Sequence, residues 1–446
     1  MIGVSFYNAY WFDSDMLKLW GDEATLTYWL DVEVALAQAE ADLGVIPAAA
    51  AKRIAEVAVP SNFDLAEMGR QIAVAQHPLV PVLKHLETLA GEDAGGWIHW
   101  GATTQNIFDT AQAIQMQRTV AVMIGRLDEI NVKLAAQART HARTLQAGRT
   151  HGQHALPISF GYKVAGWLAE LRRHRHRLST LEPQAFVARL GGAAGTYAAL
   201  DGRGREIEAA YARLLNLSAP DIGGRADFDR QAAIMMAMAA CVAACERIAS
   251  DISFLQRTEI AEIAENHYPS RIGSSTMAQK RNPSESQRII GMSRLVRSRV
   301  PLALEAMIRQ DEGDAASTNV TDLLIPDFFV LVGSVLSAFN TLLDGIHVDA
   351  AKMRANLDLT GGQISAEAVM MSLGEALGRG HAHHILHQAA ATALESGISF
   401  SEAILNHPEL ANLNVPLDLE AMLDPANYLG EVEAVIDQLT DDHANG

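Results

Sequence analysis

Residues 232–240, Ala-Ala-Ile-Met-Met-Ala-Met-Ala-Ala, indicate how this chain folds. They lie inside residues 227–266, a stretch of 40 residues that contains neither glycine nor proline. As one helix this stretch would span about 60 Å, roughly twice the diameter of a small domain. Because residues 232–240 are apolar nearly all round, a helix here is buried on all sides. We therefore expect a bundle of long helices in which neighbouring subunits cover what one chain leaves exposed, most simply by a four-helix association of equivalent helices.

Other stretches that are poor in glycine and proline extend the predicted bundle. Residues 109–143 contain one glycine and no proline. Helical patterns also run through residues 168–181 and 284–310, and Pro301 should kink the second of these. Strand patterns are nearly absent. The central part of the chain is therefore predicted to consist of long helices that pack side by side.

Shorter helical segments flank this central part. Residues 14–43 repeat apolar side chains at helical spacing, and a glycine and a proline soon end that helix. Glycines interrupt the chain again in its last quarter. The predicted fold is all-α, a homotetramer with a multi-helix core, and each chain has three helical domains: residues 1–108, 109–350 and 351–446.

The composition excludes some classes of partner. The 446 residues include 53 acidic and 35 basic side chains, which gives a formal net charge of -18. A nucleic acid or an anionic membrane surface is therefore a poor partner for the chain as a whole. The N-terminus has no basic region followed by an apolar run, and no unbroken run of 18 apolar residues occurs. We expect a soluble, cytoplasmic protein.

The sequence contains one pair of cysteines and one cluster of histidines, and both kinds of side chain often bind metals. The only cysteines, Cys241 and Cys245, share a helix face but are badly oriented for a disulfide, so we interpret them as packed small hydrophobes. Four histidines at helical spacing could form a metal site, but a solvated helix face is the simpler interpretation. These are His381, His383, His384 and His387.

A small, polar segment precedes the predicted helix at 284–310. Residues 273–283 read Gly-Ser-Ser-Thr-Met-Ala-Gln-Lys-Arg-Asn-Pro. Such a segment can close over a ligand and present hydroxyls and backbone N–H groups to an anion. An ordinary surface turn uses the same small residues. Lys280 and Asn282 favour a loop that closes over an anionic ligand.

Two further segments place polar side chains next to predicted helices. Residues 99–106, His-Trp-Gly-Ala-Thr-Thr-Gln-Asn, precede a long helix, and a helix N-terminus attracts carboxylates. Helix capping accounts for one of these polar side chains but not for four. Residues 148–155, Gly-Arg-Thr-His-Gly-Gln-His-Ala, include His151, which can exchange a proton near neutral pH. His77 precedes a proline, which holds its backbone extended. Each histidine could instead be structural.

Together these segments resemble the motifs of the fumarase/aspartase superfamily, in the same order and over nearly the whole chain. Residues 273–283 are similar to Gly-Ser-Ser-x-Met-Pro-x-Lys-x-Asn-Pro, with Ala278 in place of a proline, which should loosen the loop. Residues 101–106 look like Gly-x-Thr-Ser-x-Asp, except at Thr104 and Asn106, whereas residues 150–155 match Thr-His-x-Gln-x-Ala. The resemblance is closest to the adenylosuccinate lyase and 3-carboxy-cis,cis-muconate cycloisomerase branch.

The resemblance implies an elimination that needs no metal or organic cofactor. A base removes the proton next to a carboxylate, and the adjacent carbon then loses its leaving group, usually giving fumarate. Ser274 is the implied base, and Lys280 with loop N–H groups would stabilise its alkoxide. Both His151 and His77 are candidates for the general acid. The implied substrate-binding residues, in sites that three subunits share, are Thr103, Thr104, Gln153, Gln256, Ser275, Met277 and Asn282.

Two features narrow the implied substrate. Bacterial muconate cycloisomerases usually lack the histidine that His151 provides here. Adenylosuccinate lyases usually carry an arginine for the nucleotide phosphate near the position of Asp322, and an acidic residue repels phosphate. We therefore predict a carbon–nitrogen lyase that acts on a small N-substituted aspartate or succinate-type dicarboxylate and releases fumarate.

Two other interpretations stay open. The same proton abstraction followed by return of a proton would make the protein an epimerase or a cycloisomerase. The departures from the family motifs at Ala278 and Asn106 are the reason to retain this alternative. A helical scaffold without catalysis is the third, because folds are reused. Retention of Ser274, Lys280 and His151 together favours an enzyme.

Overall fold

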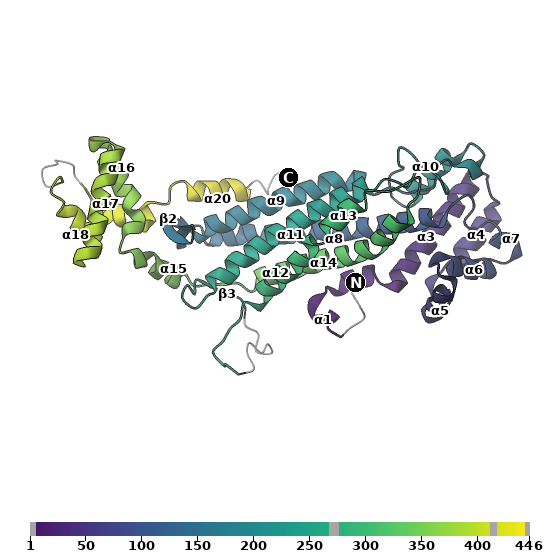
Figure 1. Cartoon of the computed structure of the whole chain (residues 1–446), viewed down its shortest axis with the longest axis horizontal. Helices are drawn as coiled ribbons and strands as arrows, with labels where there is room; N and C mark the ends of the chain where they lie inside the picture. The colour runs from purple at the N-terminus through teal and green to yellow at the C-terminus, as the bar shows by residue number, and fades with distance from the viewer. Residues whose placement is uncertain (1–5, 267–275, 411–416, 442–446) are drawn as a thin grey trace. The chain divides into compact units, whose positions relative to one another are not determined.

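The computed structural model describes residues 6–266, 276–410 and 417–441. Helices make up most of these residues, and the strands among them form two short antiparallel pairs (Figure 1). The predicted all-α class is therefore confirmed. Ser274 and Ser275 lie outside the described residues.

The chain divides into two compact units, and each unit draws on three parts of the sequence. Unit 1 comprises Met1–Asp128, Arg173–Glu246 and Arg288–Phe339, and unit 2 comprises Glu129–Arg172, Arg247–Gln287 and Asn340–Gly446. The boundaries between the units fall inside five long helices. These are α8 (Thr104–Thr140), α9 (Phe160–Ala185), α11 (Asp229–Leu255), α12 (Ser284–Arg297) and α14 (Ala315–Asp344). The division into three domains at residues 108 and 350 stays a prediction.

Unit 1 contains the shorter helices of the N-terminal part of the chain. They are α1 (Asn8–Trp11), α2 (Ser14–Leu19), α3 (Asp22–Asp42), α4 (Ala48–Val57), α5 (Leu65–Ala75), α6 (Leu79–Ala90) and α7 (Glu92–Gly95), joined after α9 by α10 (Gly204–Leu214). The predicted helix at 14–43 is therefore two helices, which Trp20 and Gly21 separate. Asp13 caps α2 by accepting hydrogen bonds from two backbone N–H groups, and it also pairs with Arg126 of α8 at 3.0 Å.

Met16 shows how α2 packs against α14 within unit 1. Its side chain is buried and lies against Gly333. A Cβ atom added to Gly333 would lie 2.4 Å from the Met16 side chain, so only glycine fits at this close approach. The N-terminal segment is thereby fixed to a long helix of the unit.

Helix α11 is shorter than the predicted helix at 227–266. It ends at Leu255, and strand β3 (Ile263–Ala264) then pairs with β4 (His347–Val348). Ala261 has a left-handed φ of 50°, and the N–H of Glu262 donates to the Leu255 carbonyl. The prediction was wrong here because no glycine or proline marks the end. Instead, tertiary hydrogen bonds of the buried Glu262 side chain fix the chain in a turn.

A β-hairpin in unit 2 was not predicted. β1 (Leu145–Thr150) and β2 (Gln153–Ser159) pair antiparallel, with Thr150 opposite Gln153 (Figure 1 labels β2). His151 and Gly152 form the connecting turn with positive φ angles of 52° and 77°, the signs that a type I′ hairpin turn requires. Gly148 and Pro157 lie inside the strands, and these residue types obscure a strand pattern in the sequence.

Short helices make up the C-terminal part of unit 2. They are α15 (Ala350–Leu357), α16 (Ala366–Leu377), α17 (Arg379–Ser396), α18 (Phe400–Leu405), α19 (Leu419–Leu423) and α20 (Val432–Asp441). One buried apolar cluster joins α16 to α19, and its members include Val369, Leu373, Leu386, Ile404 and Leu419. The predicted return to shorter helices after residue 350 is confirmed.

Local predictions about the long helices hold in part. Helix α12 ends at Arg297, and α13 (Val300–Glu305) begins with Pro301 near its N-terminus, so the chain has a break near the proline rather than the predicted kink. The helix predicted to continue to residue 310 ends at Glu305. Cys241 and Cys245 of α11 are both fully buried, and neither forms a disulfide. They therefore pack as small apolar side chains.

Helices α11 and α14 are long and apolar enough to cross a membrane, by length and composition alone. In their most apolar windows, 61% and 78% of the residues are buried inside the protein. Such burial is typical of helices that form a protein core. The cytoplasmic location stays a prediction.

Candidate active site

His77 lies between α5 and α6, where its imidazole ring is held in one orientation. Its Nδ1 atom lies 3.3 Å from the backbone nitrogen of Leu79 and 3.4 Å from that of Val80, so it accepts hydrogen bonds from the first turn of α6. A neutral imidazole that accepts at Nδ1 carries its proton on Nε2. Nε2 lies 3.4 Å from the Thr104 hydroxyl oxygen. His77 therefore presents an N–H group to the start of α8.

The polar segment before α8 combines structural and candidate binding residues. Asn106 is fully buried, and its Oδ1 atom accepts from the N–H groups of Thr103 at 3.0 Å and Gly192 at 3.2 Å. An aspartate at this position would accept the same two hydrogen bonds, so the departure from the family motif is structurally conservative. Thr104 begins a helix of 37 residues, and its hydroxyl lies at a terminus that attracts carboxylates.

Unit 1 also holds buried charges that the sequence analysis did not identify. Arg189 is 2% exposed and pairs with Asp227 at 2.5 Å. Burial raises the pKa of Asp109, although the positive charge of Arg189 opposes the change. The glycines of this region are the sequence feature that could have indicated close packing here. A Cβ atom added to Gly191 would lie 2.1 Å from the carbonyl oxygen of Gly223, so the two backbones touch.

Glu262 forms a buried ion pair with strand β1 of the β-hairpin in unit 2. Its carboxylate accepts from Gln146 Nε2 at 2.7 Å, Arg149 Nη2 at 2.5 Å and Asn356 Nδ2 at 2.8 Å. Burial alone would raise the pKa of Glu262, but these hydrogen bonds outweigh it and lower the pKa. Gln146 and Arg149 both belong to β1, so Glu262 fixes the strand that leads to His151.

Replacing Glu262 with alanine is expected to lower the free energy of unfolding by about 3 kcal/mol, because Arg149 would keep a buried charge without its partner. Chemical denaturation monitored by circular dichroism measures this change. Glu259→Ala is the matched control, since Glu259 is exposed three residues away and should cost less than about 0.5 kcal/mol. Equal losses in the two variants would contradict a stabilising role for the ion pair.

The tip of the hairpin carries the predicted residues of the second polar segment. His151 and Gln153 are both exposed and flank Gly152 in the turn. His154 lies one step further, opposite Arg149 in the strand register. Burial, together with the Arg149 charge, lowers the pKa of His154, which keeps that imidazole neutral. His151 is the histidine of this hairpin that faces solvent.

Gln256 connects the end of α11 to the segment that follows the polar loop. Its Nε2 atom donates to the Arg281 carbonyl at 3.2 Å, and its Oε1 atom accepts from the Glu265 N–H at 2.9 Å. Lys280 is exposed one residue before Arg281, and Asn282 follows it. Gln256 therefore links the backbone at Glu265 to the backbone at Arg281 and helps to position the segment that carries Lys280.

The predicted site residues fall in both units. Unit 1 contains His77, Thr103 and Thr104, and unit 2 contains the other described ones, namely His151, Gln153, Gln256, Met277, Lys280 and Asn282. Within unit 1 the structure brings His77 to Thr104, and within unit 2 it brings Gln256 to the segment that carries Lys280. The roles of Ser274 as base and Ser275 as a substrate ligand stay predictions, because both residues lie outside the described parts of the chain.

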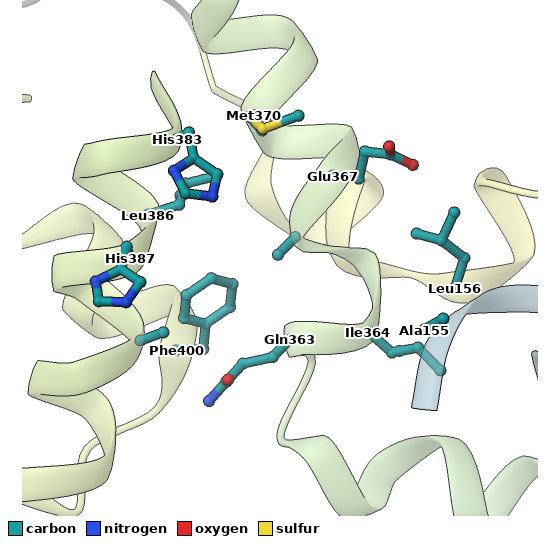
Figure 2. Close-up of a pocket in the computed structure, with 12 residues that line it drawn as sticks. Ala155, Leu156, Gln363, Ile364, Glu367, Met370, His383, Leu386, His387 and Phe400 are labelled. Atoms are coloured by element: carbon teal, nitrogen blue, oxygen red, sulfur yellow. The ribbon is translucent and has the colours of Figure 1, made fainter. Parts of the chain in front are cut away.

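The four clustered histidines do not share one site. His381 pairs with Glu409 at 2.6 Å, and Nε2 of His384 accepts a hydrogen bond from Gln388 Nε2 at 3.0 Å. His383 and His387 line a cavity of about 350 Å³ together with Phe400 and other apolar side chains. Figure 2 shows both rings on α17, with Glu367 on the facing helix α16 and its carboxylate turned away from them. Among the residues that the structure describes, no group of three or more histidine, cysteine, aspartate or glutamate side chains is placed to hold a metal ion.

Two protein-family models match consecutive parts of the chain. Residues 12–298 match the family model described as Lyase, and residues 362–439 match the model described as Adenylosuccinate lyase C-terminus. The chain belongs to the fumarase/aspartase superfamily of lyases and cycloisomerases. The resemblance read from the motifs is thereby confirmed.

Individual relatives differ in the reaction that their names state. The chain is 36% identical to the N-acetyl-S-(2-succino)cysteine lyase of Enterococcus italicus, over 96% of this chain and 93% of that protein. It is 34% identical to the 3-carboxy-cis,cis-muconate cycloisomerase of Bradyrhizobium diazoefficiens, over 94% of both chains. A crystal structure of a fumarate lyase from Mesorhizobium sp. BNC1 superposes with a TM-score of 0.89 at 34% identity and covers 99% of both chains.

Proposed function

We propose that this protein is a carbon–nitrogen lyase that converts a small N-substituted aspartate, or a related succinate-type dicarboxylate, into fumarate and an amine. The observation that carries the proposal is the fixed orientation of His77, whose Nε2–H points to Thr104 at the N-terminus of α8. A proton donor beside a carboxylate-binding helix terminus is what the departing group of a dicarboxylate needs.

The elimination balances without a redox partner. A base takes the proton from the carbon next to one carboxylate, and the electron pair of that bond forms the new carbon–carbon double bond. The bond between carbon and nitrogen breaks, and the general acid gives the amine a proton. In this proposal Ser274 is the base, Lys280 stabilises its alkoxide, and His77 or His151 is the acid. Thr103, Thr104, Gln153, Lys280 and Asn282 would bind the substrate carboxylates. Ser275, Met277 and Gln256 are the other proposed substrate-binding residues.

Absorbance in the fumarate band tests the proposal directly. The purified protein is incubated with a panel of N-substituted aspartates and, in the reverse direction, with fumarate plus amines. Appearance or loss of the band identifies the reaction and the leaving group. No change with any member of the panel would count against the lyase.

Two other reactions have an observation in their favour. The similarity to N-acetyl-S-(2-succino)cysteine lyase favours cleavage of a carbon–sulfur bond, so S-substituted mercaptosuccinates belong in the same panel. The similarity to a cycloisomerase favours an isomerase that returns a proton without releasing a group. Deuterium uptake from solvent with a change in optical rotation and no fumarate would identify the isomerase.

The homotetramer is proposed on the basis of an uncovered apolar stripe on α11. Met236 is 40% exposed, Ala240 is exposed, and Ala233, Ala237 and Ala243 are partly exposed on the same helix face. A core helix that leaves such a stripe open can bury it against the equivalent helices of other subunits. Shared active sites would then follow, as the family resemblance implies.

Ala240→Arg is expected to break the oligomer, because four guanidinium groups would meet where small apolar side chains pack. Light scattering after size-exclusion chromatography should show a shift to smaller mass, together with loss of activity. Ala73→Arg on α5 is the matched control, since Ala73 is also exposed but lies outside the stripe. A variant at Ala240 that keeps the wild-type mass would exclude this face as the interface.

A further inference from the structure

A cavity of about 230 Å³ lies within unit 1 beside His77. Helices α3, α8 and α14 supply most of its walls, and Pro78 follows His77 directly. This volume suits part of a small substrate. The lining consists of Trp20, Thr25, Trp29, Pro78, Phe108, Gln112, Gln115, Asp322 and Pro326. Three aromatic rings and a single charged side chain therefore face one small space.

The aromatic walls are held in place by contacts within the unit. Trp20 stacks on Phe329 with ring centroids 5.5 Å apart, and its Nε1–H donates to the Thr119 hydroxyl at 3.0 Å. Trp29 lies against Phe108 at 5.2 Å between centroids. Rings with fixed neighbours present their faces to a ligand without first losing conformational entropy. The aromatic walls of the cavity are therefore held in place before a ligand binds.

The charged wall is the carboxylate of Asp322, which accepts a hydrogen bond from Gln112 Nε2 at 3.3 Å. Asp322 is exposed on the surface of the protein, but the walls on its cavity side partly desolvate it and raise its pKa. The negative charge of Asp109 acts in the same direction, whereas Gln112 and the positive charge of Arg309 oppose it. A cation inside the cavity would relieve this cost, and aromatic faces attract the same kind of ligand.

The cavity adjoins the candidate active-site residue His77 through Phe108 and Pro78. Phe108 lines it and also stacks with His77, with 6.1 Å between the ring centroids. His77 in turn reaches Thr104 through Nε2. A substrate whose carboxylate lies at the start of α8 would therefore extend its other end past His77 and Phe108 into the cavity.

We propose that this cavity binds the departing end of the substrate and selects leaving groups that carry a positive charge. The aromatic rings would hold the cation by cation–π contact, and Asp322 would pair with it. The inference rests on the proposed lyase function and adds the class of substrate, namely aspartates or succinates whose leaving group is a cationic amine. Asp322 would disfavour a leaving group that carries its own carboxylate.

Binding of unreactive probes tests the pocket without turnover. Isothermal titration calorimetry compares benzyltrimethylammonium, benzyl alcohol and phenylacetate, which share a ring and differ in charge. The wild type is expected to bind the cation about tenfold more tightly than the alcohol and to bind phenylacetate more weakly still. Quenching of tryptophan fluorescence by the bound cation, lost in part in Trp29→Phe, places the probe in the cavity.

Asp322→Asn should lose about tenfold in affinity for the cation and change little for benzyl alcohol. Glu312→Gln is the matched control, because it removes an exposed carboxylate that does not line the cavity. If Asp322→Asn fails to fold, Trp29→Leu serves as the second variant and should weaken the cation selectively. Equal affinities for cation and alcohol in the wild type, or an unchanged preference in Asp322→Asn, would overturn the inference.

The binding and turnover results separate this inference from the proposed function. Cation binding that depends on Asp322, with no fumarate from any substrate, keeps the pocket and removes the lyase. Fumarate production with equal rates for cationic and anionic leaving groups keeps the lyase and removes the pocket's role. If Asp322→Asn lowers kcat/KM about tenfold for substrates with cationic leaving groups and for no others, both the lyase function and the role of the cavity are supported.

Discussion

Asparagine in place of His77 is expected to lower kcat for fumarate formation by about 10²- to 10⁴-fold, the usual contribution of a general acid. The substitution is chosen for its geometry. Oδ1 of the asparagine can take the place of Nδ1 as acceptor for the N–H groups of Leu79 and Val80, so α6 keeps its cap. The group that is lost is the Nε2–H that faces Thr104. A fall in kcat with little change in KM would indicate a group that acts in the transition state.

His85→Asn provides the matched control for the His77 substitution. His85 also belongs to the α6 region, but it is partly exposed and its Nε2 atom contacts the backbone carbonyl of Asn62 at 3.0 Å. Its replacement should leave kcat within about twofold of the wild type. Should both variants retain full activity, His77 would not be the acid, and His151 at the hairpin tip would be the remaining candidate. The same pair of variants therefore decides between the two histidines.

Sequence patterns were sufficient for the long helices because each depends mainly on residues close in sequence. Residues 109–143 lack breakers apart from one glycine, and α8 forms over Thr104–Thr140. Burial of the apolar segment at 232–240 also followed from its composition, although Met236 and Ala240 stay uncovered within one chain. Helix content could thus be predicted without knowledge of the tertiary contacts.

Tertiary hydrogen bonds explain where the sequence patterns failed. The end of α11 at Leu255 depends on Glu262, whose carboxylate is held by residues 94 to 116 positions away. No local signal encodes such a contact. The hairpin escaped detection for a related reason, because Gly148 lies at its bulge and Pro157 lies within a strand. The Glu262 hydrogen bonds and the hairpin together position His151. The motif identified this residue but not its place in the fold.

The candidate site shows the same limit of sequence analysis. Motif resemblance identified His77 and Thr104 separately, and the structure adds that they touch and that Nδ1 of His77 is already used by α6. The aromatic cavity beside them was not predicted, because its lining residues are scattered between Trp20 and Pro326 and carry no common motif. Asp322 was noticed only as a departure from an expected arginine.

Glu40→Gln is expected to stabilise the protein at alkaline pH by as much as about 5 kcal/mol. Glu40 of α3 is fully buried, and neither carboxylate oxygen has a hydrogen-bond partner among the described residues. Burial, reinforced by the negative charge of Glu33, raises the pKa of Glu40 to about 8. The folded protein therefore holds this proton more tightly than the unfolded chain, in which the carboxyl has its ordinary pKa of 4.5. Stability contributed by the protonated group falls as pH rises from about 4.5 and is lost above about 8.

Unfolding in guanidinium chloride at pH 6 and pH 9, at one protein concentration, measures this effect. The wild type should lose stability between the two conditions, and Glu40→Gln should lose much less, since glutamine has no proton to release. Glu23→Gln is the control, because Glu23 is exposed in the first turn of the same helix and should change stability by less than about 1 kcal/mol at both pH values. If wild type and Glu40→Gln show the same dependence on pH, Glu40 is not protonated in the folded protein. Glu33, which pairs with His99 at 2.7 Å, would then have to share its surroundings with a second buried negative charge.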